Sequence, residues 1–299
     1  MKKILLTGKN GQVGWELQRT LAPLGEIVAV DVGDLDLSNP EAIRQAVRSI
    51  KPDIIVNPAA YTAVDKAESE SELAMAINGV APGIFAEEAR KLGALLVHYS
   101  TDYIFDGRKK GPYLESDEPN PLSVYGKTKL AGEQAVCASG ANHLIFRTSW
   151  VYGARGKNFL LTMLRLAKER SELRVVDDQI GAPTWSRSLG EITALVLAQL
   201  CAPGAGKDVM EQVSGSYHLT SSGQVSWCGF TAEILRMANV QPLPRLVPIT
   251  TPEYPTPAAR PMNSVLLNDK LTRTFGLAAG SWESNLRLCL EEKLGHEVQ

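Results

Sequence analysis

The first half of the chain alternates short apolar runs with longer segments whose apolar residues recur at helical spacing. This alternation is typical of strand–helix–strand units that build a parallel sheet. Five of the runs are apolar enough to be strands buried on both faces, and they cover residues 3–7, 27–31, 54–57, 95–100 and 144–148. The pattern therefore predicts an α/β fold with a parallel sheet.

Helices are expected between these strands. After the first strand, Val13, Leu17, Leu21 and Leu24 recur at helical spacing. The next helix should begin within residues 38–41, where a capping side chain is followed by a proline and an acid.

The alternation weakens after about residue 150. Residues 241–261 contain seven prolines, so this stretch cannot be a regular helix. We expect ordered loops and edge segments over a ligand cleft, with a simple linker as the alternative. Helices should resume near residue 268 and over 281–294.

The charge balance excludes two classes of partner. The 299 residues include 31 Lys and Arg against 33 Asp and Glu, so no field of one sign favours nucleic acid or an anionic membrane. The longest apolar stretch, at residues 192–200, falls short of the ~20 residues that cross a bilayer. We expect neither a nucleic-acid nor a membrane partner, and an anionic ligand must be bound locally.

The cysteines and histidines show no metal-ligand spacing. Cys137, Cys201, Cys228 and Cys289 lie far apart, which favours reduced thiols in a cytoplasmic protein over a disulfide framework or a zinc site. The histidines are equally scattered, and we expect them to be structural; they are His98, His143, His218 and His296.

A glycine-rich turn follows the first predicted strand. Gly8 and Gly11 allow a sharp turn and close approach to a pyrophosphate, while Gly14 allows the helix to pack on the sheet. Asp31 ends the second strand twenty residues after Gly11, where a carboxylate can bind the adenosine ribose; a capping aspartate in a turn is the alternative. Asp31 disfavours a 2′-phosphate, whereas Lys9 softens that repulsion, so NADH and NADPH both remain open. The turn predicts a dinucleotide-binding, Rossmann-type doubly wound sheet.

A second motif suits proton transfer. Tyr125 and Lys129 lie one turn apart on a predicted helix, where the ammonium can lower the phenol pKa from its ordinary value near ~10. This spacing alone is more often a solvated helix face. Thr101 strengthens the case, because it stands at the carboxyl end of the fourth strand, where it can orient a carbonyl oxygen.

Together these residues resemble the extended short-chain dehydrogenase/reductase family. Further stretches at 57–65, 100–107, 147–153, 177–184 and 257–261 are similar to the dTDP-4-dehydrorhamnose reductases within it, and the likeness covers nearly the full chain. The resemblance implies reduction of the 4-keto group of a dTDP-linked sugar by NADPH, with NADH as the other candidate donor, in the last step of dTDP-rhamnose biosynthesis. It also implies a smaller C-terminal substrate-binding domain. We expect the Rossmann domain to comprise residues 1–150 with parts of about 173–200, and the second domain about 151–172 and 201–299.

The resemblance also implies roles for individual residues. For the cofactor these are Gly8, Gly11, Gln12, Val13 and Gly14 at the pyrophosphate, Asp31, Asp36 and Leu37 at the adenosine, and Ala60, Tyr61, Thr62, Tyr99, Tyr125 and Lys129 along the remainder. Tyr125, Lys129 and Thr101 are the expected catalytic residues. The implied substrate contacts are Thr101, Asp102 and Trp150. Without the resemblance, Trp150 could equally be an aromatic residue of the core. Arg260 suits a diphosphate because guanidinium binds phosphate bidentately, with a surface salt bridge as the alternative.

Some family members dimerise around a divalent cation held by carboxylates. Glu16 and Glu292 match two of those positions, but Arg187 stands at the third, which argues against Mg²⁺ here. We therefore expect a homodimer without a metal site.

Two alternatives stay open. The first is a nucleotide-sugar dehydratase or epimerase on the same fold, although Tyr103 occupies the position after Asp102 where dehydratases typically carry their glutamate base. The second is a non-catalytic NADP-binding subunit, because the regulatory subunit of methionine adenosyltransferase resembles this family. The presence of Tyr125, Lys129 and Thr101 favours an enzyme.

Overall fold

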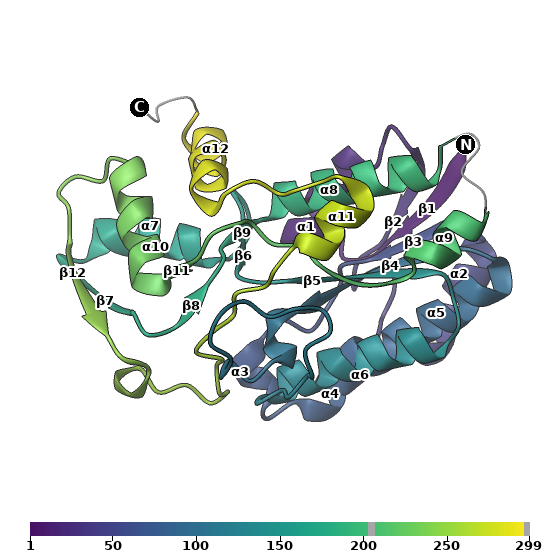
Figure 1. Ribbon diagram of the computed structural model, residues 1–299, viewed down its shortest axis with the longest axis horizontal. Helices are drawn as coiled ribbons and strands as arrows, with labels where there is room; N and C mark the ends of the chain where they lie inside the picture. The colour runs from purple at the N-terminus through teal and green to yellow at the C-terminus, as the bar shows by residue number, and fades with distance from the viewer. Residues whose placement is uncertain (203–206, 296–299) are drawn as a thin grey trace.

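A computed structural model describes residues 1–202 and 207–295 of the protein, so His296 lies outside the described residues. Its centre is a six-stranded sheet in which every pairing is parallel, in the order β10-β5-β4-β3-β1-β2 (Figure 1). The strands are β1 (Lys2–Leu6), β2 (Gly25–Ala29), β3 (Ile54–Asn57), β4 (Leu95–Thr101), β5 (His143–Thr148) and β10 (Gly215–His218). The α/β prediction and its five strands are confirmed, each strand to within two residues at either end.

Strand β10 was not predicted. Its four residues, Gly-Ser-Tyr-His, are too short and too polar to show a strand pattern, yet they pair with β5. Residues 215–218 therefore belong to the main sheet, although they fall within the range expected for the substrate-binding domain. The rest of the expected domain division stays a prediction.

Alternate side chains of each buried strand pack on opposite faces of the sheet. On one face, Ile4 and Leu6 join a core formed with helices α1 (Gln12–Thr20), α8 (Ser186–Leu200) and α11 (Asp269–Phe275). On the other face, Leu5 joins a core formed with α2 (Pro40–Ile50), α5 (Ala81–Leu92) and α6 (Val124–Ala138). Figure 1 shows α8 and α11 on one side of the sheet and α5 and α6 on the other. Packing on both faces makes this a doubly wound sheet.

The predicted helix signals agree with the structure. Asn39 caps α2 by accepting hydrogen bonds from the backbone N–H groups of Glu41 and Ala42, and Pro40 is the first helical residue. The remaining helices before residue 150 are α3 (Val64–Ala67), α4 (Ser71–Met75), the π-helix η1 (Ala76–Val80) and the 3₁₀ helix η2 (Asp102–Ile104).

A second hydrophobic core lies beyond the carboxyl end of the sheet (Figure 1). It is built from α7 (Phe159–Glu169), α10 (Trp227–Met237) and α12 (Trp282–Leu294), with the short strand pairs β7 (Glu172–Val176) with β12 (Arg245–Ile249), β8 (Ile180–Gly181) with β11 (Val225–Ser226) and β6 (Val151–Tyr152) with β9 (Thr184–Trp185). The proline-rich segment contributes β12 and the 3₁₀ helix η3 (Thr251–Glu253), so it is ordered edge structure and not a linker. The short α9 (Lys207–Val213) precedes β10.

The order of the strands fixes where a ligand can bind. The chain runs from β1 outward to β2 and then crosses back to β3 on the other side of β1. The loops that follow β1 and β3 therefore diverge at the carboxyl edge and leave a crevice between them. Among residues 1–202 and 207–295, no helix has both the length and the apolarity required to cross a membrane.

Candidate active site

A cavity of about 770 Å³ opens at this switch point between β1 and β3. Every residue expected at the cofactor lines it, namely Gly8, Gly11, Gln12, Val13, Gly14, Asp31, Asp36, Leu37, Ala60, Tyr61, Thr62, Tyr99, Tyr125 and Lys129. The structure thus brings together residues from five separate stretches of the chain. The expected substrate contacts Thr101, Asp102, Trp150 and Arg260 are not part of this lining.

The glycine loop has the geometry that close approach of a phosphate requires. Gly8 has a φ of 61°, a left-handed conformation that favours glycine. A Cβ on Gly14 would lie 2.0 Å from the Gly8 carbonyl oxygen, so a side chain there would push helix α1 away from the loop. Gly11 is the N-cap of α1 and offers no side-chain acceptor, which leaves the first amides of the helix available to an anion.

Asp31 holds the glycine loop against the end of β2. Its Oδ2 accepts a hydrogen bond from the backbone N–H of Asn10 at 2.8 Å, and its Oδ1 accepts one from Val32 at 2.8 Å. Lys9, which was expected to soften the repulsion of a 2′-phosphate, pairs with Asp34 at 2.7 Å. Asp31 therefore makes the turn contacts of the alternative interpretation while it also lines the cavity.

Helix α6 is fixed at its start by two caps. The Ser123 hydroxyl accepts a hydrogen bond from the N–H of Gly126 at 3.2 Å, and Glu68 accepts one from the N–H of Val124 at 2.9 Å. These contacts set the first turn, which places Tyr125 and Lys129 along the same cavity wall.

Lys129 is buried, and its ammonium is hydrogen-bonded to the neighbouring strand β4. Its Nζ donates a hydrogen bond to the main-chain oxygen of Tyr99 at 2.6 Å and lies 3.4 Å from Nε2 of His98. Burial lowers the pKa of Lys129 to about 8, although Glu133 acts in the opposite direction. Tyr99 serves here through its backbone, because its side chain lies in the core with its hydroxyl 2.6 Å from Thr193.

The electrostatics of Tyr125 differ from the sequence-based expectation. Burial raises the pKa of Tyr125, and the carboxylate of Asp102 raises it further, while the Thr101 side chain lowers it. Lys129, whose ammonium is bonded to the Tyr99 carbonyl, is not among the groups that shift this pKa in the structure, so its expected effect on the phenol stays a prediction. The phenol therefore keeps its proton at neutral pH, which is the state that a proton donor needs.

Thr101 and Asp102 form a buried pair beside the phenol. The Thr101 hydroxyl donates to Oδ1 of Asp102 at 3.0 Å, and burial raises the pKa of Asp102 to about 6. The ring of Tyr103 meets Tyr125 edge-on, with 5.4 Å between ring centroids. The hydroxyl of Tyr103 in turn accepts a hydrogen bond from Arg260 at 3.1 Å.

Trp150 lies where the main sheet meets the second core. Its ring stacks on that of Trp227 with 3.5 Å between centroids and a 6° angle between planes. Its backbone has a φ of 49°, which bulky residues rarely adopt, so the surrounding packing holds this ring in a strained position. The expected contact with the sugar stays a prediction.

Two hydroxyl groups in the cavity were not predicted from the sequence. Ser100 and Thr148 stand at the carboxyl ends of adjacent strands and line the cavity. Within the described part of the chain, neither hydroxyl has a hydrogen-bond partner, although both are buried. Such groups normally find a partner, so they suit a polar ligand such as a nicotinamide dinucleotide. Their positions at strand ends were the only signal that could have revealed them.

The carboxylates implied for a cation do not form a metal site. Nη1 of Arg187 lies 3.8 Å from Glu292, so a guanidinium already supplies positive charge there. Burial and Glu292 raise the pKa of Glu16, and Arg187 lowers it. The described ranges contain no group of three or more His, Cys, Asp or Glu able to hold a metal ion. The donor set therefore does not fit Mg²⁺.

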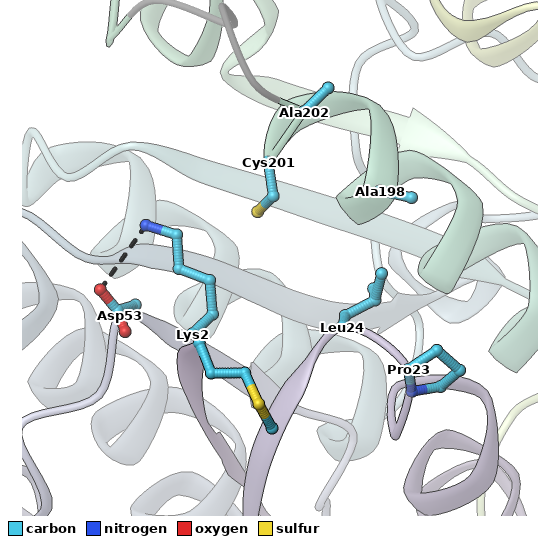
Figure 2. A pocket seen from close by; sticks show the side chains of 8 residues that line it. Lys2, Pro23, Leu24, Asp53, Ala198, Cys201 and Ala202 are labelled. Atoms are coloured by element: carbon cyan, nitrogen blue, oxygen red, sulfur yellow. Dashed lines mark ion pairs between the residues drawn. The ribbon is translucent and has the colours of Figure 1, made fainter.

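A second hollow, of about 600 Å³, lies at the opposite edge of the sheet, where β1 and β3 begin. Figure 2 shows its ion pair between Lys2 and Asp53, which are 3.6 Å apart, and the thiol of Cys201. Burial raises the pKa of this thiol, so little reactive thiolate forms. The hollow contains none of the residues expected at the site.

The doubly wound sheet, the glycine loop at its switch point and the Tyr125–Lys129 pair define a nicotinamide-dependent oxidoreductase of the short-chain dehydrogenase/reductase class. A family model described as "RmlD substrate binding domain" matches residues 1–294. The chain belongs to this family.

The chain is similar to individual relatives over nearly their whole length. The chain is 49% identical to a dTDP-4-dehydrorhamnose reductase of Burkholderia thailandensis over 298 residues, covering 98% of this chain and 99% of that protein. The crystal structure of a dTDP-4-dehydrorhamnose reductase from Clostridium acetobutylicum is 41% identical, covers 97% of this chain and 99% of its own, and has a TM-score of 0.88. The same enzyme from Bacillus anthracis, in complex with NADP, is 38% identical with a TM-score of 0.87 and covers 97% of this chain and 99% of its own.

Proposed function

We propose that the protein reduces the 4-keto group of dTDP-4-dehydro-L-rhamnose to give dTDP-L-rhamnose, with NADPH as the hydride donor. This is the last step of dTDP-rhamnose biosynthesis. The observation that carries the proposal is the position of the Tyr125 phenol on the wall of a dinucleotide-sized cavity, beside Thr101 and Lys129. The family and the relatives named above support the same reaction.

The proposed reaction gives separate roles to Tyr125, Thr101 and Lys129. When bound, NADPH would supply a hydride to the 4-keto carbon. Tyr125 donates its proton to the carbonyl oxygen as negative charge develops there, and the Thr101 hydroxyl orients that oxygen. The ammonium of Lys129 lies in the cavity wall, where it stabilises the phenolate that remains after the proton transfer.

Recognition of the sugar nucleotide is assigned to the second domain and its border. Trp150 offers an aromatic face to the sugar, and Arg260 offers a guanidinium to the diphosphate. We assign residues of about 151–172 and 201–299 to this domain, with β10 excepted. We also propose that the protein is a homodimer and that it acts in the cytoplasm. A reducing compartment fits its free thiols, which are Cys137, Cys201, Cys228 and Cys289.

The decisive experiment follows NADPH absorbance after addition of dTDP-4-dehydro-L-rhamnose, with NADH in a parallel reaction. We expect loss of absorbance that depends on the sugar, and dTDP-L-rhamnose as the product by NMR. An epimerase would convert the sugar without net loss of NADPH, and a binding subunit would leave both compounds unchanged. Either result would contradict the proposed reduction.

A further inference from the structure

A buried chain of polar side chains runs beneath the cofactor cavity. The Thr7 hydroxyl donates a hydrogen bond to Oδ1 of Asn57 at 2.6 Å, and Nδ2 of Asn57 lies 3.2 Å from Nδ1 of His98. On its other side, Nε2 of His98 lies 3.4 Å from Nζ of Lys129. All four side chains are buried. The two ends of the chain, Thr7 and Lys129, both line the cavity.

The hydrogen-bonding capacity of each group fixes the role of the histidine. An ammonium has three donors and no acceptor, so His98 must accept from Lys129 through an unprotonated Nε2. The proton of the neutral ring is then on Nδ1, on the side of Asn57. In the structure Asn57 turns Oδ1 to Thr7 and Nδ2 to the ring, which would set two donors against each other once Nδ1 is protonated. The oxygen and nitrogen of an amide have the same shape, so the neutral ring requires the flipped amide, with its oxygen toward Nδ1 and its NH₂ toward Thr7.

The surroundings keep the ring neutral. His98 is fully buried, and burial together with the positive charge of Lys129 lowers its pKa well below the ordinary value. A protonated His98 would lose its only acceptor and would place two cations side by side. Asn57 on β3 is the remaining side chain hydrogen-bonded to the ring, and it carries no charge.

We propose that His98 is a positioning residue for Lys129. The Tyr99 carbonyl accepts from one N–H of the ammonium and His98 accepts from a second, which leaves the third N–H for a ligand in the cavity that Lys129 lines. Without His98, two hydrogens would be free, and the amine would not be fixed toward the cofactor and the phenolate. This role rests on the proposed function, in which Lys129 stabilises the phenolate of Tyr125.

Two substitutions distinguish the contact that His98 makes through Nε2 from the one that it makes through Nδ1. In His98→Gln the amide reaches the position of Nε2, so an acceptor for Lys129 is kept. In His98→Asn the amide reaches only the position of Nδ1, so the contact with Asn57 is kept and the contact with Lys129 is lost. The two variants carry the same functional group in the same buried site, which makes each the control for the other.

Steady-state kinetics with NADPH and the dTDP-sugar provide the first test. We expect His98→Asn to lower kcat by about 10-fold or more, because a small misplacement of a group in the active site slows the reaction, with the KM for NADPH little changed. His98→Gln should restore most of kcat. Wild-type kcat in His98→Asn, or an equal loss in both variants, would overturn the positioning role.

A second measurement needs no turnover and therefore separates this inference from the proposed function. The Cε resonance of Lys129, assigned with Lys129→Arg, is followed by ¹³C NMR across pH. The amine faces His98 and the Tyr99 carbonyl on β4, with Tyr125 and Glu133 on its own helix. Loss of a neutral acceptor disfavours the ammonium, so the pKa of Lys129 should fall in His98→Asn and stay near that of the wild type in His98→Gln. Identical titrations in all three proteins would overturn the inference even if the wild-type enzyme is inactive with the sugar.

Discussion

Nη2 of Arg260 lies 2.9 Å from Oδ2 of Asp65, which ties the proline-rich segment to helix α3 at the side of the cavity. The guanidinium also donates to the Tyr103 hydroxyl, and the ring of Tyr103 contacts Tyr125. Arg260 thus makes the salt bridge of the alternative interpretation. A substrate diphosphate would compete with Asp65 for the same guanidinium, so the pair makes the role of Arg260 testable.

Arg260→Gln should raise the KM for the dTDP-sugar by about 10-fold or more, because a hydrogen bond to a charged group contributes roughly 1.5–3 kcal/mol. The KM for NADPH should not change. Asp65→Asn is the matched control, since it removes the competing carboxylate and should leave the KM for the sugar unchanged or lower. An unaltered KM in Arg260→Gln would leave only the salt bridge as the role of this residue.

Tyr125→Phe removes the proposed proton donor and keeps the ring. We expect kcat to fall by roughly 10²-fold or more, while the dissociation constant of NADPH, measured by fluorescence titration, stays close to that of the wild type. Tyr113→Phe serves as the control, because its hydroxyl bonds to Asp106 outside the cavity and should not affect kcat. Full turnover by Tyr125→Phe would mean that another group delivers the proton.

The cofactor cavity was predictable because its residues belong to short local motifs. Gly8, Gly11 and Asp31 follow recognisable strands, and parallel strands bring their carboxyl ends to one edge. The Tyr125–Lys129 spacing is likewise local to one helix. Such patterns place a residue on an element and an edge, which is sufficient to predict which residues meet.

Contacts made by side chains across the sheet were not predictable. The bond from Lys129 to the Tyr99 carbonyl, and the approach of His98, depend on how α6 packs on β4. For this reason the sequence predicts only a structural role for His98 and a direct effect of Lys129 on Tyr125. Strand β10 was missed for a different reason, since its polar residues carry no strand signal and its place depends on pairing with β5.

Gly126 allows helix α6 to approach the end of β4 closely. A Cβ at this position would lie 2.2 Å from the main-chain oxygen of Tyr103, which is a backbone atom and cannot rotate away. Gly126→Ala should therefore displace the first turn of α6, destabilise the protein by about 1–3 kcal/mol and lower kcat through Tyr125. Thermal unfolding and kinetics measure both effects. Gly33→Ala is the control, because nothing lies within 4 Å of its Cβ, and an equal response of the two variants would contradict this steric argument.

Glu88 on helix α5 couples the stability of the fold to acid pH. Its side chain is 2% exposed, and its carboxylate accepts hydrogen bonds from Arg48 at 2.8 Å and from Lys91 at 2.7 Å. The hydrogen bonds from Arg48 and Lys91 lower its pKa from 4.5 to about 2, against the effect of burial. A carboxylate whose pKa is lower in the folded than in the unfolded state contributes stability above the unfolded value and loses it as pH falls toward the folded value.

Glu88→Gln should therefore be less stable than the wild type at neutral pH, and the difference should shrink as the pH falls from about 5 toward about 2. Urea unfolding at a series of pH values measures the free energies of both proteins. Glu87→Gln is the control, because this carboxylate is half exposed and bonds to Arg44 at 3.1 Å, so its effect should be small at every pH. A difference for Glu88→Gln that stays constant with pH would show that lost packing, and not the ionised carboxylate, is responsible, since only an ionised group responds to protons in this range.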